Sequence, residues 1–251
     1  MRRSDVEVEF VERLGEVIEQ ADAVKPDDLQ DQGRDEISRL THTIARFVRA
    51  IRANEEQMQL TNQELAFLAE HDPLTKLANR RHFDAAARAM LSKSPSPLCL
   101  VIADIDRFKD VNDTYGHDVG DKALVHVAQL LQSSTRDNDV LARTGGEEFT
   151  AILPVESLSA GMELCERIRI QIESHPLILS EQLKLPITLS LGMVLIEGLP
   201  RKKGETLMPQ LLKNGLRAAD LALYKAKQTG RNRVCVAPAP LNADLMTSEE
   251  S

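Results

Sequence analysis

The sequence predicts an α+β fold, with a ferredoxin-like β-α-β-β-α-β core that follows an α-helical coiled-coil stalk. Three observations lead to this architecture. Strand-like apolar runs alternate with amphipathic stretches between residues 98 and 236, which is typical of a mixed or antiparallel sheet backed by helices. Two glycines near residue 145 separate two such runs and indicate a β-hairpin. Apolar residues also recur at heptad spacing between residues 37 and 68.

The N-terminal part is predicted to contain two helices. Residues 5–24 carry apolar residues on one helical face, and a polar break at 25–28 ends this helix. The first heptad position is then occupied by Ile37, Ile44, Ile51, Met58 and Leu65. The position three residues later is occupied by Leu40, Phe47, Asn54, Thr61 and Leu68. The repeat favours a dimeric coiled coil, and the alternative is one long amphipathic helix that packs on its own domain.

Asn54 and Thr61 place polar groups at coiled-coil core positions, so the coil is predicted to be weak and adjustable in register, as a signal-transmitting stalk requires. Pro73 then stops the helix. We therefore expect four segments: a helix and loop (1–33), a coiled-coil dimerisation stalk (34–71), a core domain (72–236) and a disordered tail (237–251) that is rich in proline and alanine and then acidic.

The core domain is predicted to alternate strands and helices in a regular order. A helix follows Pro73 and ends at about residue 92, and a loop covers residues 94–97. The later helices are expected over 121–132, 157–173 and 208–228, and the strands over 98–104, on both sides of the paired glycines, and over 187–194 and 233–236. Residues 107–120, rich in Asn, Asp and Gly, are predicted to be a loop, and the basic run 201–204 a solvated surface loop.

Composition excludes several classes of function. The net charge of −8 and the eight aromatic residues argue against a general nucleic-acid-binding surface. The three cysteines are widely spaced and predict buried thiols rather than disulfides. No apolar run approaches the roughly 20 residues that span a bilayer, and the N-terminus does not resemble a signal peptide. The sequence therefore predicts a cytoplasmic protein with no membrane span.

The run Arg143–Phe149 carries the first sign of chemistry. Gly145 and Gly146 allow a tight turn with accessible backbone N–H groups, and Glu147 and Glu148 follow at once. A hairpin tip of this kind suits a metal ion that carries a polyphosphate. The alternative is a solvated turn that merely contains glutamates.

Asp104 lies at the end of the predicted strand 98–104, where a carboxylate is well placed to bind a metal ion, although aspartates also commonly terminate strands. The following polar loop contains Asn112 and ends near Asp121. An Asp can accept the two N–H groups of a guanine edge, and an Asn offers both a donor and an acceptor. The same groups would leave adenine poorly paired.

Five ordered motifs together resemble the GGDEF family of diguanylate cyclases over about residues 70–236. They are Asp72–Arg80, Asp104–Asp113, Gly116–Asp121, Gly145–Phe149 and Ala222–Asn232. The resemblance implies the nucleotidyl-cyclase palm fold and the condensation of two GTP into cyclic di-GMP and two pyrophosphates. The chain departs from the family pattern at Thr144, where an aromatic residue is more usual, and in a long stretch between residues 191 and 216.

The resemblance also implies roles for individual residues. Mg²⁺ (or Mn²⁺) would be bound by Asp104, the Ile105 carbonyl, Glu147 and Glu148. The catalytic residues would be Glu147, as the acceptor of the proton, and Lys109, which would stabilise charge in the transition state. The substrate-binding residues would be Asn112, His117, Asp121, Gly145, Gly146, Lys227 and Arg231.

Two further features concern regulation. Arg136 and Asp139 resemble the family's RxxD product-inhibition site, and Arg167 could complete it from a helix, although a charged loop and a solvated helix arginine are the alternatives. If each domain holds one GTP, catalysis requires a homodimer, which the stalk could form. No sensor domain is recognisable, so a regulatory protein that binds the N-terminal helices is the expected input. The alternative function is a non-catalytic module that binds GTP or cyclic di-GMP, and a purely structural dimer scaffold is a third reading.

Overall fold

The computed structural model describes residues 31–94, 96–136, 138–197, 207–238 and 241–242. The chain divides into two compact units, Met1–Ala66 and Phe67–Ser251. The predicted helix at residues 5–24, the basic run 201–204 and most of the predicted tail lie outside the described residues. Among the described helices, none is both long and apolar enough to cross a membrane.

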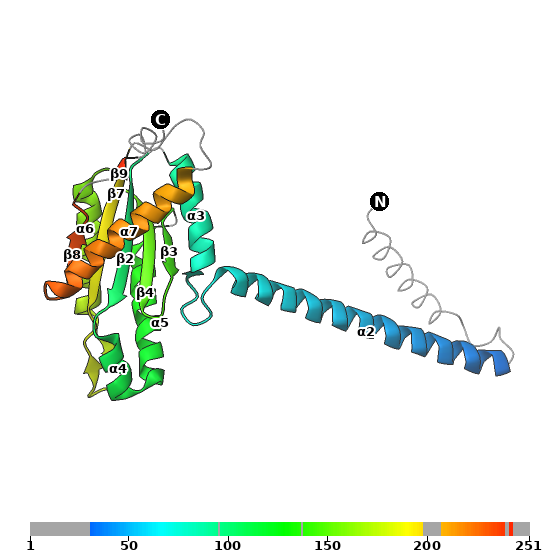
Figure 1. Ribbon diagram of the computed structural model, residues 1–251. Coiled ribbons are helices and arrows are strands. Elements are labelled where there is room, and N and C mark those ends of the chain that lie inside the picture. The colour runs from blue at the N-terminus through cyan, green and yellow to red at the C-terminus, as the bar shows by residue number, and fades with distance from the viewer. Residues whose placement is uncertain (1–30, 95, 137, 198–206, 239–240, 243–251) are drawn as a thin grey trace. The chain divides into compact units, whose positions relative to one another are not determined.

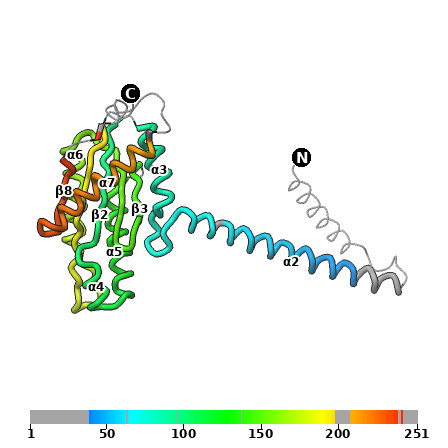
Figure 2. Tube along the Cα trace, viewed as in Figure 1, coloured from blue at the N-terminus to red at the C-terminus, as the bar shows by residue number. Residues whose placement is uncertain are grey.

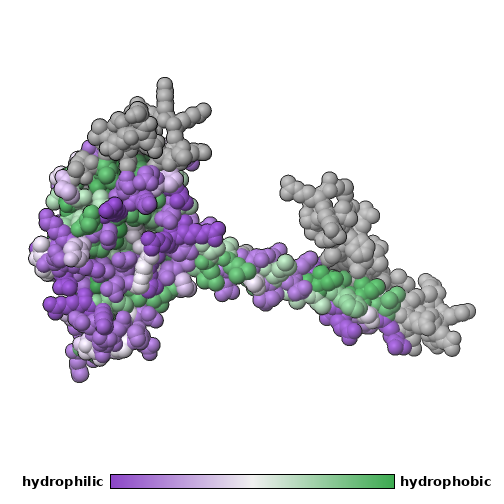
Figure 3. All heavy atoms as spheres, viewed as in Figure 1, coloured by the Kyte–Doolittle hydropathy of each residue, from purple (hydrophilic) through white to green (hydrophobic). Residues whose placement is uncertain are grey.

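Helix α2 (Asp31–Glu70) is continuous over the whole heptad region. Its large apolar side chains are mostly exposed, and those of Leu40, Phe47, Ile51, Met58, Leu65 and Leu68 all belong to the two predicted core positions. Figure 3 shows apolar side chains interspersed with polar ones along this helix. Since exposed apolar stripes on long helices usually pack against another surface, α2 has the form expected of a coiled-coil stalk.

The second unit is built on a mixed sheet. Its strands are β1 (Ala78–Asn79), β2 (Leu98–Ile105), β3 (Val140–Arg143), β4 (Glu148–Pro154), β7 (Leu189–Glu197), β8 (Val234–Val236) and β9 (Leu241–Asn242). The order is β1-β3-β4-β2-β7-β8, and β9 also pairs with β7. The central pairs β3–β4, β4–β2 and β2–β7 are antiparallel. This is the predicted ferredoxin-like arrangement, with parallel strands added at its edges.

Helices cover both faces of the sheet (Figure 1). They are α3 (Arg80–Lys93), α4 (Phe108–Tyr115), α5 (His117–Ser134), α6 (Leu158–Ser174) and α7 (Leu207–Gln228). Alternate residues of β2 point to opposite faces, and all eight are buried. One face of β2 packs with α3 and α7, and the other packs with α5 and α6. Figure 2 shows α7 lying across the sheet beside α3.

Local chemistry explains where several elements begin. The Asn79 side chain accepts a hydrogen bond from the His82 backbone N–H and caps α3. The Ser157 hydroxyl accepts one from the Ala160 N–H and caps α6. A small separate sheet, β5 (Leu177–Ile178) with β6 (Lys184–Leu185), connects α6 to β7.

The structure differs from the sequence-based elements in three places. Residues 108–115, predicted to be loop, form α4, and α5 begins at His117 rather than at Asp121. The short strands β1, β5 and β6 were not predicted. Leu241–Asn242, within the predicted disordered tail, forms β9 in parallel with β7. In each case tertiary contacts supply order to a segment whose own sequence favours a loop.

An ion pair between two partly buried side chains connects the start of the second unit to the β3–β4 hairpin. The Arg143 Nη1 atom lies 3.1 Å from both carboxylate oxygens of Asp72, and Arg143 Nη2 donates to the Gly146 carbonyl at 2.6 Å. Although burial by itself raises the pKa of Asp72, hydrogen bonds from Thr75 and Arg143 lower it below its ordinary value. Arg143 therefore connects the segment that follows α2 to the glycine turn.

Candidate functional site

The candidate active site begins at the carboxyl end of β2. Asp104 is paired in register with Glu148 of β4 on one side and with Ser190 of β7 on the other. Its side chain is almost completely buried, with 3% of the residue exposed. Because the central strand is enclosed on both faces, the carboxylate of Asp104 is held at a fixed position at the edge of the core.

The hairpin between β3 and β4 brings Glu147 to the same place. The Ile105 N–H donates to the Glu147 carbonyl at 3.3 Å, which joins the turn to the end of β2. A Cβ at Gly145 would lie 2.6 Å from the Glu148 Oε2 atom, which is the end of a flexible side chain and could move aside. Gly146 has open space around it. Neither glycine has a positive φ angle, so the structure does not make the glycine pair a requirement of the turn.

Positive charge reaches these acids from α7. The Lys227 Nζ atom lies 2.8 Å from the Asp104 Oδ2 atom. Even so, burial raises the pKa of Asp104 above its ordinary value, and the charges of Glu148 and Asp106 add to this effect, while Lys227 opposes it.

The pKa of Glu147 is also raised. Burial is the largest cause, the charges of Asp104 and Glu148 act in the same direction, and Lys227 opposes them. The pKa of both Asp104 and Glu147 is thus raised chiefly by burial, and the neighbouring carboxylates add to the effect. A carboxyl group in such a setting favours proton uptake or an additional cation.

The donor set fits a hard divalent cation. Asp104, Glu147, Glu148 and the Ile105 carbonyl offer only oxygen atoms, which are the ligands that Mg²⁺ prefers. No three His, Cys, Asp or Glu side chains converge into a metal-binding cluster among the residues that the structure describes. Lys227 stands beside Asp104 in this arrangement, so its ammonium group supplies part of the charge that a cation would bring.

Helices α4 and α5 hold the residues proposed to read the base. Asn112 is half-buried on α4, and its side chain lies against Gly120 of α5, where a Cβ would meet the Asn112 Oδ1 atom. Gly120 therefore allows the two helices to approach. Asp121 and His117 are exposed on α5, with Asp121 next to this contact. Asn112 and Asp121 thus lie near one another on adjacent helices.

The remaining candidate cations lie on two elements. Lys109 is exposed in the first turn of α4, shortly after β2 ends. Lys227 lies in the last turn of α7, and Arg231 is exposed in the turn that follows. The ion pair with Asp104 ties Lys227 to the acids.

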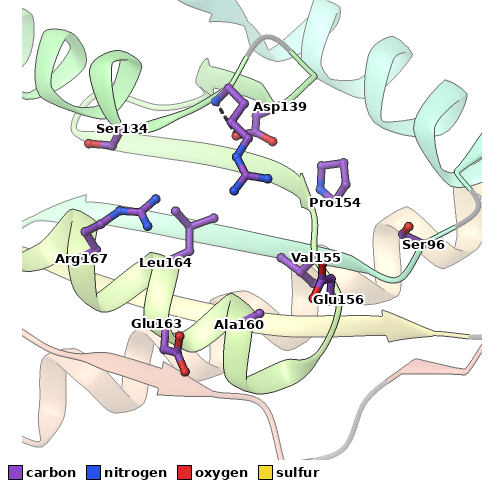
Figure 4. A pocket seen from close by; sticks show the side chains of 11 residues that line it. Ser96, Ser134, Asp139, Pro154, Val155, Glu156, Ala160, Glu163, Leu164 and Arg167 are labelled. Carbon is purple, nitrogen blue, oxygen red and sulfur yellow. Dashed lines mark hydrogen bonds between the residues drawn. The ribbon is translucent and has the colours of Figure 1, made fainter.

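The three residues of the predicted inhibitory site line one cavity. Arg136, Asp139 and Arg167 border a space of about 450 Å³ between the α5–β3 connection and α6 (Figure 4). The Asp139 carboxylate accepts a 2.7 Å hydrogen bond from the Arg136 N–H, which closes the turn. Burial raises the pKa of Asp139, although this hydrogen bond and the Arg136 charge oppose the change. The structure thus brings Arg136, Asp139 and Arg167 together around one cavity that is lined in part by charged side chains.

The sequence reasoning missed Asp106 and Asn232. Asp106 accepts hydrogen bonds from the hydroxyls of Thr188 and Ser190 and from the Asn232 N–H. The available signal was the spacing of Asp104 and Asp106, because residues two apart on an extended strand point to the same side. The ion pair of Asp72 with Arg143 was also not anticipated.

This combination of a ferredoxin-like palm, paired acids at a hairpin and a facing lysine defines a nucleotide-binding catalytic domain. The model of the "Diguanylate cyclase, GGDEF domain" family matches residues 69–233. The chain belongs to the GGDEF diguanylate cyclase family, and the resemblance expected from its motifs is confirmed.

Individual relatives agree with this assignment. A probable diguanylate cyclase of Escherichia coli, DgcT, is 38% identical over 67% of this chain and 36% of its own length. The coiled coil and GGDEF domain of DgcB from Caulobacter crescentus, solved in complex with c-di-GMP, match with a TM-score of 0.62 at 31% identity, over 77% of this chain and 98% of that one.

Diguanylate cyclase SiaD of Pseudomonas aeruginosa, solved with its activator SiaC, matches with a TM-score of 0.58 at 26% identity, over 93% of this chain and 85% of that one. The chain spans half or less of the length of the curated relatives that it matches.

The raised pKa of Glu147 predicts a dependence of stability on pH. A carboxyl whose pKa is higher in the folded state than in the unfolded state destabilises the fold when both states are ionised, and this penalty vanishes as pH falls through the two pKa values. Without added metal, Glu147→Gln should therefore raise the unfolding temperature at pH 7.5, and the gain should disappear near pH 4. A thermal melt at both pH values measures this, and an equal or larger gain at the lower pH would contradict the assigned direction.

Proposed function

We propose that this protein is a diguanylate cyclase that condenses two GTP into cyclic di-GMP and two pyrophosphates. The observation that supports this most directly is the group of carboxylates Asp104, Glu147 and Glu148 at the end of β2, with Lys227 facing them. Membership of the GGDEF family and the names of its relatives support the same activity.

In the proposed complex, helices α4 and α5 bind guanine. Asp121 accepts hydrogen bonds from the N–H groups of the base edge, Asn112 completes the pairing, and His117 lines the pocket. The backbone N–H of Gly146 would meet the phosphates, and that of Gly145 would first have to leave the Glu148 carbonyl, to which it donates at 3.4 Å. The triphosphate is then neutralised by Lys109, Lys227 and Arg231, the roles that the GGDEF motifs imply for these residues.

The metal site would be formed by Asp104, the Ile105 carbonyl, Glu147 and Glu148, and would hold Mg²⁺ or Mn²⁺. A bound divalent ion supplies charge neutralisation at the phosphates and lowers the pKa of a nearby hydroxyl. The protein residues do the rest. Glu147, with its raised pKa, is suited to accept the proton of a 3′-hydroxyl near neutral pH.

Each bond-forming step is a phosphoryl transfer. The 3′-oxygen of one GTP forms a bond to the α-phosphorus of the other, the bond to the pyrophosphate oxygen breaks, and the proton passes to Glu147. Lys109 and Lys227 stabilise charge on the transferring phosphoryl group. Repeating the step with the roles exchanged closes the ring and releases the second pyrophosphate.

One GTP per domain requires two domains to face each other, so we propose a homodimer formed through α2. The exposed apolar positions of α2 support this arrangement, since a second copy would cover them. The match to the coiled coil and GGDEF domain of DgcB agrees with it.

Product inhibition and a partner protein complete the proposal. Arg136, Asp139 and Arg167 would bind cyclic di-GMP in their shared cavity and restrain the domain. The relative SiaD was solved with an activator. By analogy, a regulatory protein would bind the N-terminal helices of this chain, in the cytoplasm where GTP is available.

The test of the activity is direct. Incubation of the full chain with GTP and Mg²⁺ should give pyrophosphate and cyclic di-GMP in a 2:1 ratio. Glu147→Gln should lower kcat by at least about 100-fold, because it removes the proton acceptor. Absence of product from a demonstrably dimeric sample would favour the alternative, a non-catalytic module that binds GTP or cyclic di-GMP.

The stalk makes a second prediction. Met58 is 65% exposed at a heptad core position, and Met58→Glu should weaken the dimer by about tenfold or more because a charge would be buried at the seam. The fraction of dimer, measured by sedimentation equilibrium, and the specific activity should fall together. Gln59→Glu inserts the same charge one residue away from the seam, and an equal loss in this control would argue against dimerisation through the heptads.

The inhibitory cavity makes a third prediction. Arg136→Ala should raise the inhibition constant of cyclic di-GMP by about 10-fold or more, since charged hydrogen bonds to the ligand are lost. Initial rates of pyrophosphate release at increasing product concentration measure the change. Ser133→Ala, in the last turn of α5 just before this connection, is the control, and unchanged inhibition in Arg136→Ala would refute the assignment.

A further inference from the structure

The turn that follows α7 has an unusual backbone. Gly230, Arg231 and Asn232 all have positive φ angles, of 124°, 61° and 45° respectively. Left-handed backbone is common for glycine and tolerated by asparagine, but it is unfavourable for arginine. Such a conformation persists only where surrounding contacts hold it. Arg231 is one of the residues proposed to bind the triphosphate, so these contacts bear on the reaction.

The first contact comes from Asp106, which directly follows β2. The Asn232 N–H donates to the Asp106 Oδ2 atom at 2.9 Å. Asp106 is itself fixed by the Thr188 and Ser190 hydroxyls, which donate to its two oxygens at 2.8 and 2.6 Å. The backbone of the turn is therefore tied to the strand that carries Asp104, two residues away.

The second contact comes from α6. The Arg169 Nη1 atom donates to Asn232 Oδ1 at 3.0 Å, and Asn232 Nδ2 donates to Glu173 Oε1 at 2.7 Å. Both polar ends of the asparagine side chain are thus bound by one helix.

Arg169 is held in place by its own helix. It donates to Glu166 at 2.7 Å and to Glu173 at 2.8 Å, and its side chain is only 15% exposed. Burial lowers the pKa of Arg169, but its hydrogen bonds to the two glutamates raise the pKa by more. The net pKa is therefore above the ordinary value, and the guanidinium stays charged. Arg169 is thus a partly buried residue with several hydrogen-bond partners that connect α6 to the turn.

We propose that Asp106, Asn232 and Arg169 are positioning residues that fix the turn and so aim Arg231 at the triphosphate. This inference rests on the proposed function and deepens it. The three residues act through Arg231 and through the adjacent end of α7, where Lys227 pairs with Asp104. Arg231 is exposed, so its reach is set by the backbone from which it projects. A fixed turn removes an entropic cost that a mobile one would incur on binding.

Asn232→Gly is the sharpest test. Glycine accepts the left-handed backbone and keeps the N–H that donates to Asp106, so only the connection to α6 is lost. Binding should be measured on the full chain with Mg²⁺ and α,β-methylene-GTP, which cannot release pyrophosphate, and with GMP as the ligand without a triphosphate. The affinity for the triphosphate should fall by about 3- to 10-fold, as the loss of one or two hydrogen bonds predicts. The affinity for GMP should not change.

Gln171→Ala is the matched control. It removes a different polar connection of α6, to Ser133 and Ser134 of α5, and leaves the turn intact. It should bind both ligands like the wild type. Arg169→Ala should reproduce the selective loss seen in Asn232→Gly, and Arg169→Lys, which keeps a charged donor, should restore part of the affinity.

The outcomes separate the two levels of the proposal. Unchanged triphosphate affinity in Asn232→Gly, or an equal loss for GMP, would overturn the positioning role while leaving the proposed function standing. A wild-type protein that binds no α,β-methylene-GTP would overturn the proposed function and this inference with it. In steady-state turnover the positioning role further requires a higher KM for GTP with kcat changed by less than about twofold.

Discussion

The structure of the second unit is organised around an electrostatic conflict at the end of β2. Asp104 is buried near the end of the central strand β2, and Glu147 and Glu148 lie close to it on the β3–β4 hairpin. Placing three carboxylates together in a poorly solvated site costs free energy unless cations compensate. Lys227 compensates in part, while burial and the neighbouring carboxylates raise the pKa of Asp104 and of Glu147. We propose that this site binds a cation.

Several contacts from different parts of the fold hold these acidic residues and the neighbouring turns in place. The antiparallel pairing of β2 with β4 and β7 holds Asp104, and Arg143 fastens the glycine turn to Asp72. Asp106 binds the turn that follows α7. Hydrogen bonds and ion pairs therefore connect the acids, the turn that carries Arg231 and the segment that follows α2 within one unit. This connection offers a physical basis for regulation to reach the site.

Much of this could be predicted from the sequence because the informative signals are local. The apolar run that ends at Asp104 and the glycine pair before Glu147 identify a strand end and a hairpin without any knowledge of the fold. Helix α4 was missed because asparagine, aspartate and glycine favour loops by themselves, whereas Phe108 of α4 is buried in the core. Tertiary burial outweighed local preference there.

Other features could not be predicted because their partners lie far apart in the chain. Asp106 binds Thr188, Ser190 and Asn232, and no pattern within a short window relates these residues. The same holds for Arg143 with Asp72, and for Leu241–Asn242, which pair with β7 and, through Leu241, pack against the core. Such contacts depend on the completed topology and become visible only in three dimensions.

Stabilisation of the protein by Mg²⁺ in the absence of nucleotide measures most directly whether the carboxylates around Asp104 form the proposed cation site. A ligand that binds only the folded state stabilises it increasingly as the ligand concentration exceeds the Kd, which raises the unfolding temperature. We expect millimolar Mg²⁺ to raise the unfolding temperature of the wild type at pH 7.5 and to leave that of Glu147→Gln unchanged. An equal shift in both proteins would show that the ion binds elsewhere and that these carboxylates do not form the cation site.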